Sequence, residues 1–116
     1  VFRAAKQKNP ATFTHCDAVQ GFLKVPFTAA SLGADLITVS GHKIHAPKGV
    51  GALYIKPALV RSHAISPYLI GGGQEAGLRS GTENMVGICG FGAAGLPHLP
   101  PTRRTCRHCV TDWSRR

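Results

Sequence analysis

The chain alternates short apolar runs with breaks that contain glycine, proline or asparagine, which is typical of short strands and helices joined by turns. Two apolar runs with β-branched residues predict buried strands, over residues 35–39 and 50–55. A shorter strand is expected over residues 12–16. Successive buried strands of this kind indicate an open α/β sheet, in which ligands bind at the carboxyl ends of the strands.

Turn-forming residues delimit four expected helical segments: residues 1–8, 26–34, 57–67 and 80–94. Asn9-Pro10 ends the first of them, because proline disfavours a helical conformation at the residue before it. Thr28 is a suitable N-cap for the second, and Gly33 a suitable C-cap. The third is a surface connection with one helical turn. The last begins at Ser80 or Thr82.

Candidate chemistry appears where the predicted strands end. Ser40-Gly41-His42-Lys43 follows the strand over residues 35–39 directly, and Asp17 follows the strand over residues 12–16. A lysine held at the end of a buried strand indicates an amine kept for covalent chemistry, such as a Schiff base with a carbonyl cofactor. Each signal is weak alone, because most lysines after strands are solvated and a strand-end aspartate is often a turn residue.

Three motifs considered together are more specific: HCDAVQ at residues 15–20, SGHKIHAPKGVGALY at residues 40–54 and GGGQEAGLRSGTEN at residues 71–84. Pyridoxal phosphate needs a lysine for its aldehyde, a carboxylate for its pyridine nitrogen, a donor for its ring oxygen and further donors for its phosphate. All four kinds of group occur in these motifs. With them, residues 9–94 resemble the class V aminotransferase family, and within it the cysteine desulfurases and selenocysteine lyases.

The resemblance implies a role for each matched residue. Lys43 resembles the lysine that holds the cofactor as an internal aldimine, and it is the one catalytic residue that we expect. Asp17 resembles the carboxylate that keeps the pyridine nitrogen protonated, and Gln20 the amide that bonds the ring hydroxyl. The expected phosphate ligands are Ser40, His42 and Thr82.

Thr82 resembles the phosphate ligand that one subunit of a dimer lends to the other. Its expected place at a helix start suits an anion, because free N–H groups and the helix dipole favour negative charge there. The chain departs from the usual family pattern at Ala46, where a glycine is common, and at Cys16, where an apolar residue is common. Neither position is a matched functional residue.

The resemblance implies an enzyme dependent on pyridoxal 5'-phosphate, a homodimeric cysteine desulfurase that takes sulfur from L-cysteine. Its products would be alanine and an enzyme persulfide, whose sulfur passes to an acceptor or scaffold protein in iron–sulfur cluster assembly. Two alternatives stay open. One is another class V enzyme, a selenocysteine lyase or an aminotransferase, and the other is a non-enzymatic basic adaptor.

Several parts of the family have no counterpart in the chain: an upstream phosphate loop, a histidine that stacks on the ring, a later mobile cysteine and a substrate-binding arginine. We therefore expect residues 1–95 to be a central, incomplete fragment of the large cofactor-binding domain of a fold-type I enzyme. Such a fragment is expected to be inactive by itself. Residues 96–116 have no apolar period and are expected to be a basic tail, disordered or out of frame.

The net charge is +9, from 14 lysines and arginines against five acidic residues, and it raises the question of nucleic-acid binding. Residues 98–116 hold five of the arginines and one aspartate, so a net +4 lies in the tail. The other basic residues are spread along the chain without aromatic residues between them. We expect no nucleic-acid partner, and only the basic-adaptor alternative depends on the tail.

The four cysteines have no regular spacing, which favours a reducing compartment and a cytoplasmic location. No apolar run approaches the roughly 18 residues of a membrane helix, so no membrane partner is expected. Cys106 and Cys109, with His98 and His108 nearby, supply only half of a zinc shell, because a structural site needs a second ligand pair at regular spacing. No metal site is expected.

Overall fold

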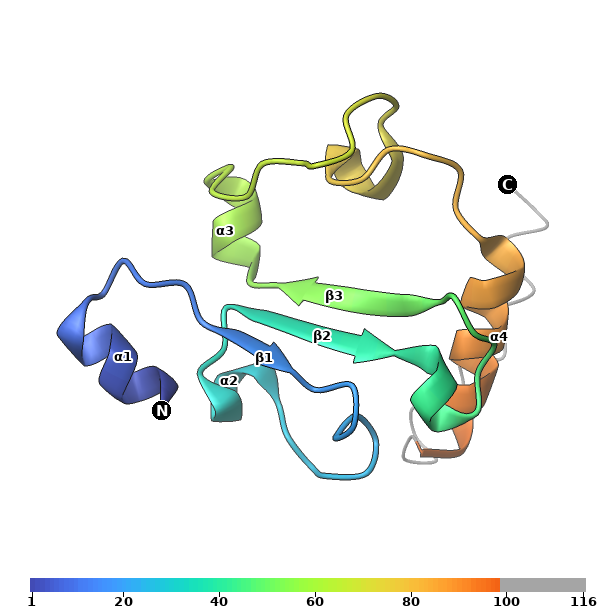
Figure 1. Ribbon diagram of the computed structural model, residues 1–116, viewed down its shortest axis with the longest axis horizontal. Helices are drawn as coiled ribbons and strands as arrows, with labels where there is room; N and C mark the ends of the chain where they lie inside the picture. The colour runs from blue at the N-terminus through green and yellow to red at the C-terminus, as the bar shows by residue number, and fades with distance from the viewer. Residues whose placement is uncertain (99–116) are drawn as a thin grey trace. The chain divides into compact units, whose positions relative to one another are not determined.

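The computed structural model describes residues 1–98 (Figure 1). The predictions for Cys106, Cys109 and His108, and for most of the 96–116 tail, lie outside the described residues. The described chain forms two compact units. The first comprises residues 1–39 and 52–83, and the second comprises residues 40–51 with the segment that begins at Asn84.

A three-stranded sheet in the order β1-β2-β3 organises the first unit. Its strands are β1 (His15–Asp17), β2 (Leu36–Ser40) and β3 (Gly51–Ile55). Strands β1 and β2 are parallel, with the register His15–Leu36, Cys16–Ile37 and Asp17–Thr38. Strand β3 runs in the opposite direction to β2 (Figure 1). The three predicted strands and the α/β class are thus confirmed, although β1 begins three residues later than expected and includes Asp17 itself.

The helices of this unit are α1 (Phe2–Lys8), α2 (Ala29–Leu32), α3 (Pro57–Arg61) and the 3-10 helix η2 (Gln74–Gly77). Helix α2 has the caps that its sequence predicts. The Thr28 side chain accepts a hydrogen bond from the Ser31 N–H, and the Ser31 hydroxyl accepts one from the Thr28 N–H. Gly33 then ends the helix in the left-handed conformation, with φ 64°.

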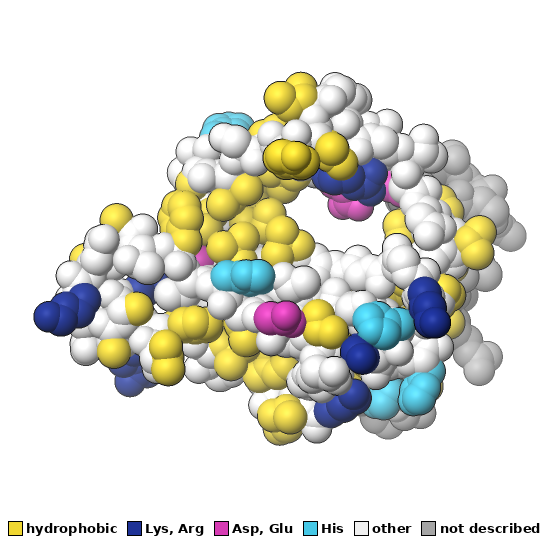
Figure 2. All heavy atoms as spheres, in the orientation of Figure 1, with side chains coloured by type: hydrophobic (Ala, Val, Ile, Leu, Met, Phe, Trp, Pro, Cys, Tyr) yellow, Lys and Arg dark blue, Asp and Glu magenta, His cyan; other side chains and the backbone are white. Residues whose placement is uncertain are grey.

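The core of the first unit is small and lies against β1 and β2. It consists of the buried residues Ala18, Ala34 and Ile37, against which half-buried side chains such as Phe2 and Leu32 pack. The prediction that β3 is buried is wrong, since Leu53 is 53% and Tyr54 40% exposed. The reason is its place at the edge of the sheet, away from this core. Figure 2 shows hydrophobic side chains over much of the visible surface.

The second unit pairs the 3-10 helix η1 (Gly41–Ile44) with the helix α4 (Met85–Gly95), which the 3-10 helix η3 (Leu96–His98) follows. The prediction that α4 begins at Ser80 or Thr82 is wrong. Its N-cap is Asn84, whose Oδ1 accepts a hydrogen bond from the Gly87 N–H at 3.0 Å. Helix α4 ends at Gly95, one residue beyond the predicted end at Ala94, and η3 follows it directly, so the helical path continues past the predicted end. No helix within residues 1–98 has the length and apolar character needed to cross a membrane.

Candidate functional site

Asp17 is the last residue of β1 and is exposed. Its Oδ1 accepts a hydrogen bond from the Val19 N–H at 3.0 Å, so one oxygen shapes the turn after the strand. No other described side chain bonds or pairs with this carboxylate. Gln20 lies in the same turn and is also exposed. The strand end therefore presents a carboxylate and an amide toward solvent.

The register of β1 and β2 separates a polar face of the sheet from its core face. His15, Asp17 and Thr38 share one face, because side chains alternate along a strand and Asp17 lies opposite Thr38. Cys16 and Ile37 point to the other face and belong to the core. His15 Nε2 and Thr38 Oγ1 are hydrogen-bonded on the polar face. His15, two residues before Asp17, thus bonds the neighbouring strand on the same face.

The lysine that the sequence singles out lies on η1, in the second unit. Lys43 is half-buried, and no acidic side chain within residues 1–98 pairs with its amine. Ser40 Oγ and His42 Nδ1 are hydrogen-bonded at 2.7 Å. The same short turn thus carries a primary amine and a linked hydroxyl–imidazole pair.

Two buried residues hold η1 in place, Gly41 and Ile44. The Gly41 N–H donates to the Val50 carbonyl at 2.9 Å, and the Gly41 carbonyl accepts from the Ala46 N–H at 3.0 Å. A Cβ atom on Gly41 would lie 3.0 Å from Val50 Cγ1, so only glycine fits without a shift of its neighbours. The backbone of the turn is therefore well determined, and it positions Lys43.

Thr82 lies in the first unit and is exposed, and no described side chain or backbone group bonds its hydroxyl. It precedes the N-cap of α4 by two residues, so the argument that a helix start favours an anion at Thr82 does not apply. Arg79 shapes this loop: its Nη1 donates to the Gly81 carbonyl at 2.6 Å, and its Nη2 lies 3.6 Å from Glu75 Oε1. The role of Thr82 as a phosphate ligand stays a prediction.

The structure divides the predicted site residues between the two units. Asp17, Gln20 and Thr82 belong to the first, whereas Ser40, His42 and Lys43 belong to the second. Within each unit the donor set fits pyridoxal phosphate. The second unit offers the amine and two phosphate donors on one turn, and the first offers a carboxylate and an amide at one strand end.

Sequence reasoning missed the acidic residue with the most contacts, Asp35. Its side chain is 4% exposed, and it contacts Lys6, Thr14 and Lys56. Burial by itself raises the pKa of Asp35, but the hydrogen bonds from Lys6 and Thr14 outweigh it and lower the pKa from 3.8 to about 2. The sequence does contain a signal for this residue, because Asp35 is a charged residue inside an apolar run, between Ala34 and Leu36. An acidic side chain is rarely buried in such a position unless other groups pair with it.

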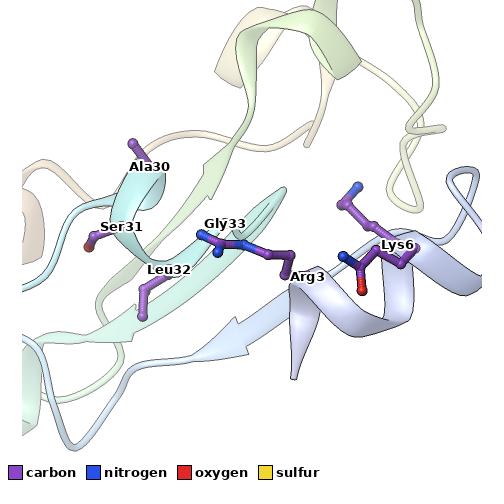
Figure 3. A pocket seen from close by; sticks show the side chains of 7 residues that line it. Arg3, Lys6, Ala30, Ser31, Leu32 and Gly33 are labelled. Atoms are coloured by element: carbon purple, nitrogen blue, oxygen red, sulfur yellow. The ribbon is translucent and has the colours of Figure 1, made fainter.

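A pocket of about 340 Å³ opens elsewhere on the first unit (Figure 3). Residues Arg3, Lys6 and Gln7 of α1 line one side, and residues 30–33 around α2 line the other. None of the predicted site residues lines it. Within residues 1–98, no three or more histidine, cysteine, aspartate or glutamate side chains are placed to hold a metal ion.

The sheet carries a carboxylate at the end of one strand, and the turn after the neighbouring strand carries an amine. This arrangement is typical of a class of proteins, those with an α/β cofactor-binding domain, of which the chain forms a part. Comparison with known proteins agrees. The family model described as "Aminotransferase class-V" matches residues 1–96. The chain belongs to the class V aminotransferase family, which consists of enzymes dependent on pyridoxal phosphate.

Among curated relatives, a cysteine desulfurase of Nostoc sp. is 49% identical over 87 residues, which are 75% of this chain and 21% of the relative. A solved NifS-like protein is 48% identical, with a TM-score of 0.70, over 79% of this chain and 24% of that one. SspA, solved in complex with cysteine, is 39% identical, with a TM-score of 0.71, over 84% of this chain and 27% of that one. The chain thus spans about a fifth of the length of the curated relatives that it matches.

Proposed function

We propose that this chain supplies the central part of the cofactor site of a cysteine desulfurase that depends on pyridoxal phosphate. The observation that carries the proposal is the η1 turn, where a half-buried lysine amine follows a hydroxyl–imidazole pair at 2.7 Å. The 49% identity to a cysteine desulfurase supports the activity. The similarity to SspA, which was solved with cysteine, supports L-cysteine as the substrate.

When bound, pyridoxal phosphate supplies an electron sink that weakens the bonds at the α-carbon of an amino acid. Lys43 would bind the aldehyde carbon through Nζ and, after release by the substrate amine, carry protons on that nitrogen. Asp17 would hold a proton on the pyridine nitrogen through charge pairing. Gln20 would donate to the ring oxygen from the same strand end.

The phosphate would take its donors from the η1 turn. Ser40 and His42 restrain each other through their hydrogen bond, so each is held close to one orientation before an anion arrives. This arrangement lowers the entropy lost when the phosphate binds. Thr82 would add a further hydroxyl. We propose that it does so in the site of a second subunit of a homodimer, which is the role implied by its resemblance to the phosphate ligand lent between subunits.

The sulfur would leave on a cysteine thiol as a persulfide and pass to an acceptor or scaffold protein. We propose a cytoplasmic location, where thiols stay reduced. Within the described residues Cys16 and Cys89 are free thiols: Cys16 is half-buried and packs against the core, whereas Cys89 is exposed.

The test uses a desulfurase graft, in which the aligned segment of this chain replaces the matching 87 residues of the Nostoc enzyme. The graft keeps that enzyme's remaining site residues, so cofactor attachment and sulfide release report on the transplanted segment. We expect the graft to bind pyridoxal phosphate covalently and to release sulfide from L-cysteine.

Lys43→Ala in the desulfurase graft should abolish covalent attachment, because no other described lysine follows a parallel strand of the sheet. The measurement is cofactor retained after borohydride reduction and denaturation, followed by sulfide release. Lys48→Ala is the matched control, since Lys48 is an exposed lysine of the next turn, and it should keep both properties. Reducible cofactor attachment in Lys43→Ala at the level of the unmodified graft would overturn the assignment.

A further inference from the structure

Asp35 is a buried carboxylate at the head of β2 that none of the proposed chemistry uses. Its Oδ2 accepts hydrogen bonds from the Thr14 N–H at 3.1 Å and the Thr14 hydroxyl at 3.0 Å. The same oxygen lies 2.6 Å from Lys6 Nζ. Its Oδ1 lies 3.4 Å from Lys56 Nζ. Four donor groups thus converge on one side chain, which is 4% exposed.

These donors come from three separate places in the chain. Lys6 lies on α1, Thr14 directly before β1, and Lys56 directly after β3. Backbone hydrogen bonds converge on the same place, because the Thr14 carbonyl accepts from the N–H groups of Asp35 at 2.9 Å and Leu36 at 3.0 Å. The Asp35 carbonyl accepts from the Lys56 N–H at 2.8 Å. One residue therefore ties a helix and two outer strands to the central strand.

Strand β1 by itself contributes little that would specify its register on β2. Strand β1 has only three residues, and only Cys16 among them packs against the core. Such a strand specifies its own pairing weakly, and a slip of one residue would turn every side chain to the opposite face. Asp17 lies three residues beyond Thr14, at the other end of the strand and opposite Thr38.

We propose that Asp35 is a positioning residue for Asp17. Its contacts with Lys6, Thr14 and Lys56, which we call the clamp, hold β1 in register on β2. This register places the Asp17 carboxylate on the polar face of the sheet. The catalytic part of this inference rests on the proposed function. The structural part does not, because it concerns contacts within the first unit alone.

The structural part is tested by amide hydrogen exchange on the desulfurase graft without cofactor. Asp35→Asn should speed exchange at Leu36 and Ala18 by about tenfold or more, because hydrogen bonds to a charged group are lost. The Ala18 N–H reports the register, since it donates to the Thr38 carbonyl at 2.9 Å. Exchange in α4, which belongs to the other unit, should change less than about twofold.

Two further variants distinguish the loss of the Asp35 contacts from a general destabilisation of the fold. Thr14→Val removes the hydroxyl that bonds Asp35 and should reproduce part of the faster exchange, whereas Thr14→Ser keeps the hydroxyl and should not. Glu75→Gln is the matched control, because Glu75 is 54% exposed and pairs with Arg79 at 3.6 Å. Unchanged exchange at Leu36 and Ala18 in the Asp35→Asn graft would overturn the clamp.

The catalytic part is tested by a double-mutant cycle on kcat in the desulfurase graft. If Asp35 acts through Asp17, Asp35→Asn should lower kcat by about tenfold or more, with less change in KM, and should have almost no effect in an Asp17→Asn background. Equal losses in both backgrounds would show a merely structural role and refute the positioning. A graft that never attaches cofactor would instead refute the proposed function, while the exchange data would still decide the clamp.

Discussion

Two aspartates of the same sheet show how environment determines what a carboxylate does. Asp17 is exposed at the end of β1 and bonds one backbone N–H through a single oxygen. Asp35 is buried at the head of β2, and both of its oxygens have partners. A carboxylate with free acceptor capacity suits a ligand, whereas one with all its partners supplied by the protein suits a structural role.

Asp17→Asn in the desulfurase graft should leave cofactor bound and lower the turnover number by about 100-fold or more, because the neutral amide no longer favours a charged pyridine nitrogen. The measurements are cofactor content by absorbance and sulfide release under saturating L-cysteine. Glu75→Gln is a control that removes an exposed acid elsewhere. Near-normal turnover in Asp17→Asn would mean that the carboxylate only shapes its turn.

The lowered pKa of Asp35 predicts a pH-dependent contribution to the stability of the first unit. A carboxyl whose pKa is about 2 when folded, against 3.8, binds its proton more readily when the chain is unfolded. The stabilisation should be complete above about pH 4 and lost as the pH falls toward about 2.

The measurement is the opening free energy of the Leu36 amide, from hydrogen exchange corrected for the intrinsic rate. The difference between the unmodified desulfurase graft and its Asp35→Asn variant should shrink across this pH window, and a difference that stays constant down to pH 2 would contradict the assignment.

At the scale of elements, the η1 turn is positioned by its own packing rather than by its sequence propensity. Gly41 is buried under Val50 and Ala46, and a Cβ atom there would lie 3.0 Å from a carbon of each. Helix α4 packs against the same segment, since a Cβ on Gly90 would lie 2.7 Å from Pro47 Cδ. Close approach at two glycines thus holds together the unit that carries Lys43.

Gly41→Ala should destabilise the second unit by about 1–3 kcal/mol, because the nearest atoms include the Val50 carbonyl, which cannot move aside as a flexible side chain can. In the desulfurase graft it should also weaken cofactor attachment through displacement of Lys43. Gly92→Ala is the matched control on α4, where an added Cβ meets nothing within 4 Å. It should stabilise the helix by about 0.5–1 kcal/mol. Hydrogen exchange at the Ala46 amide measures both effects, and equal exchange in the two variants would contradict the packing argument.

At the scale of the whole molecule, the described residues bury few side chains completely and leave several large apolar side chains exposed to solvent. Tyr68 is 95% and Ile70 85% exposed, and Leu53 on the edge strand β3 is 53% exposed. Within residues 1–98 no large side chain is fully buried. Exposed apolar surface and an unpaired sheet edge favour association over a single folded state.

The 116-residue chain alone should therefore not be a working desulfurase. With pyridoxal phosphate and L-cysteine it should form no more sulfide and alanine than free cofactor does, and it should aggregate, as measured by light scattering. The same residues within the desulfurase graft should be active, which provides the control. Turnover of the isolated chain clearly above the free-cofactor background would contradict this expectation and would direct attention to its own thiols.

Local features of the sequence predicted the elements well, because each depends on neighbours along the chain. The break at Asn9-Pro10, the Thr28 cap, the left-handed Gly33 and the strand before Ser40 all appear as expected. The start of α4 was misplaced because several residues in a row are suitable caps. Only the geometry shows that the Asn84 amide reaches the first turn. The long motifs were enough to identify the family.

The sequence by itself thus determined the order of elements, the family and the candidate residues Asp17, Gln20 and Lys43, since these follow from local pattern and motif. Only the tertiary structure decided that β3 is exposed at a sheet edge and that Asp35 is buried. A buried carboxylate is tolerated only where distant segments bring donors to it. For Asp35 these donors are Lys6, Thr14 and Lys56, at most 29 and at least 21 positions away along the chain, and no local pattern predicts that they meet.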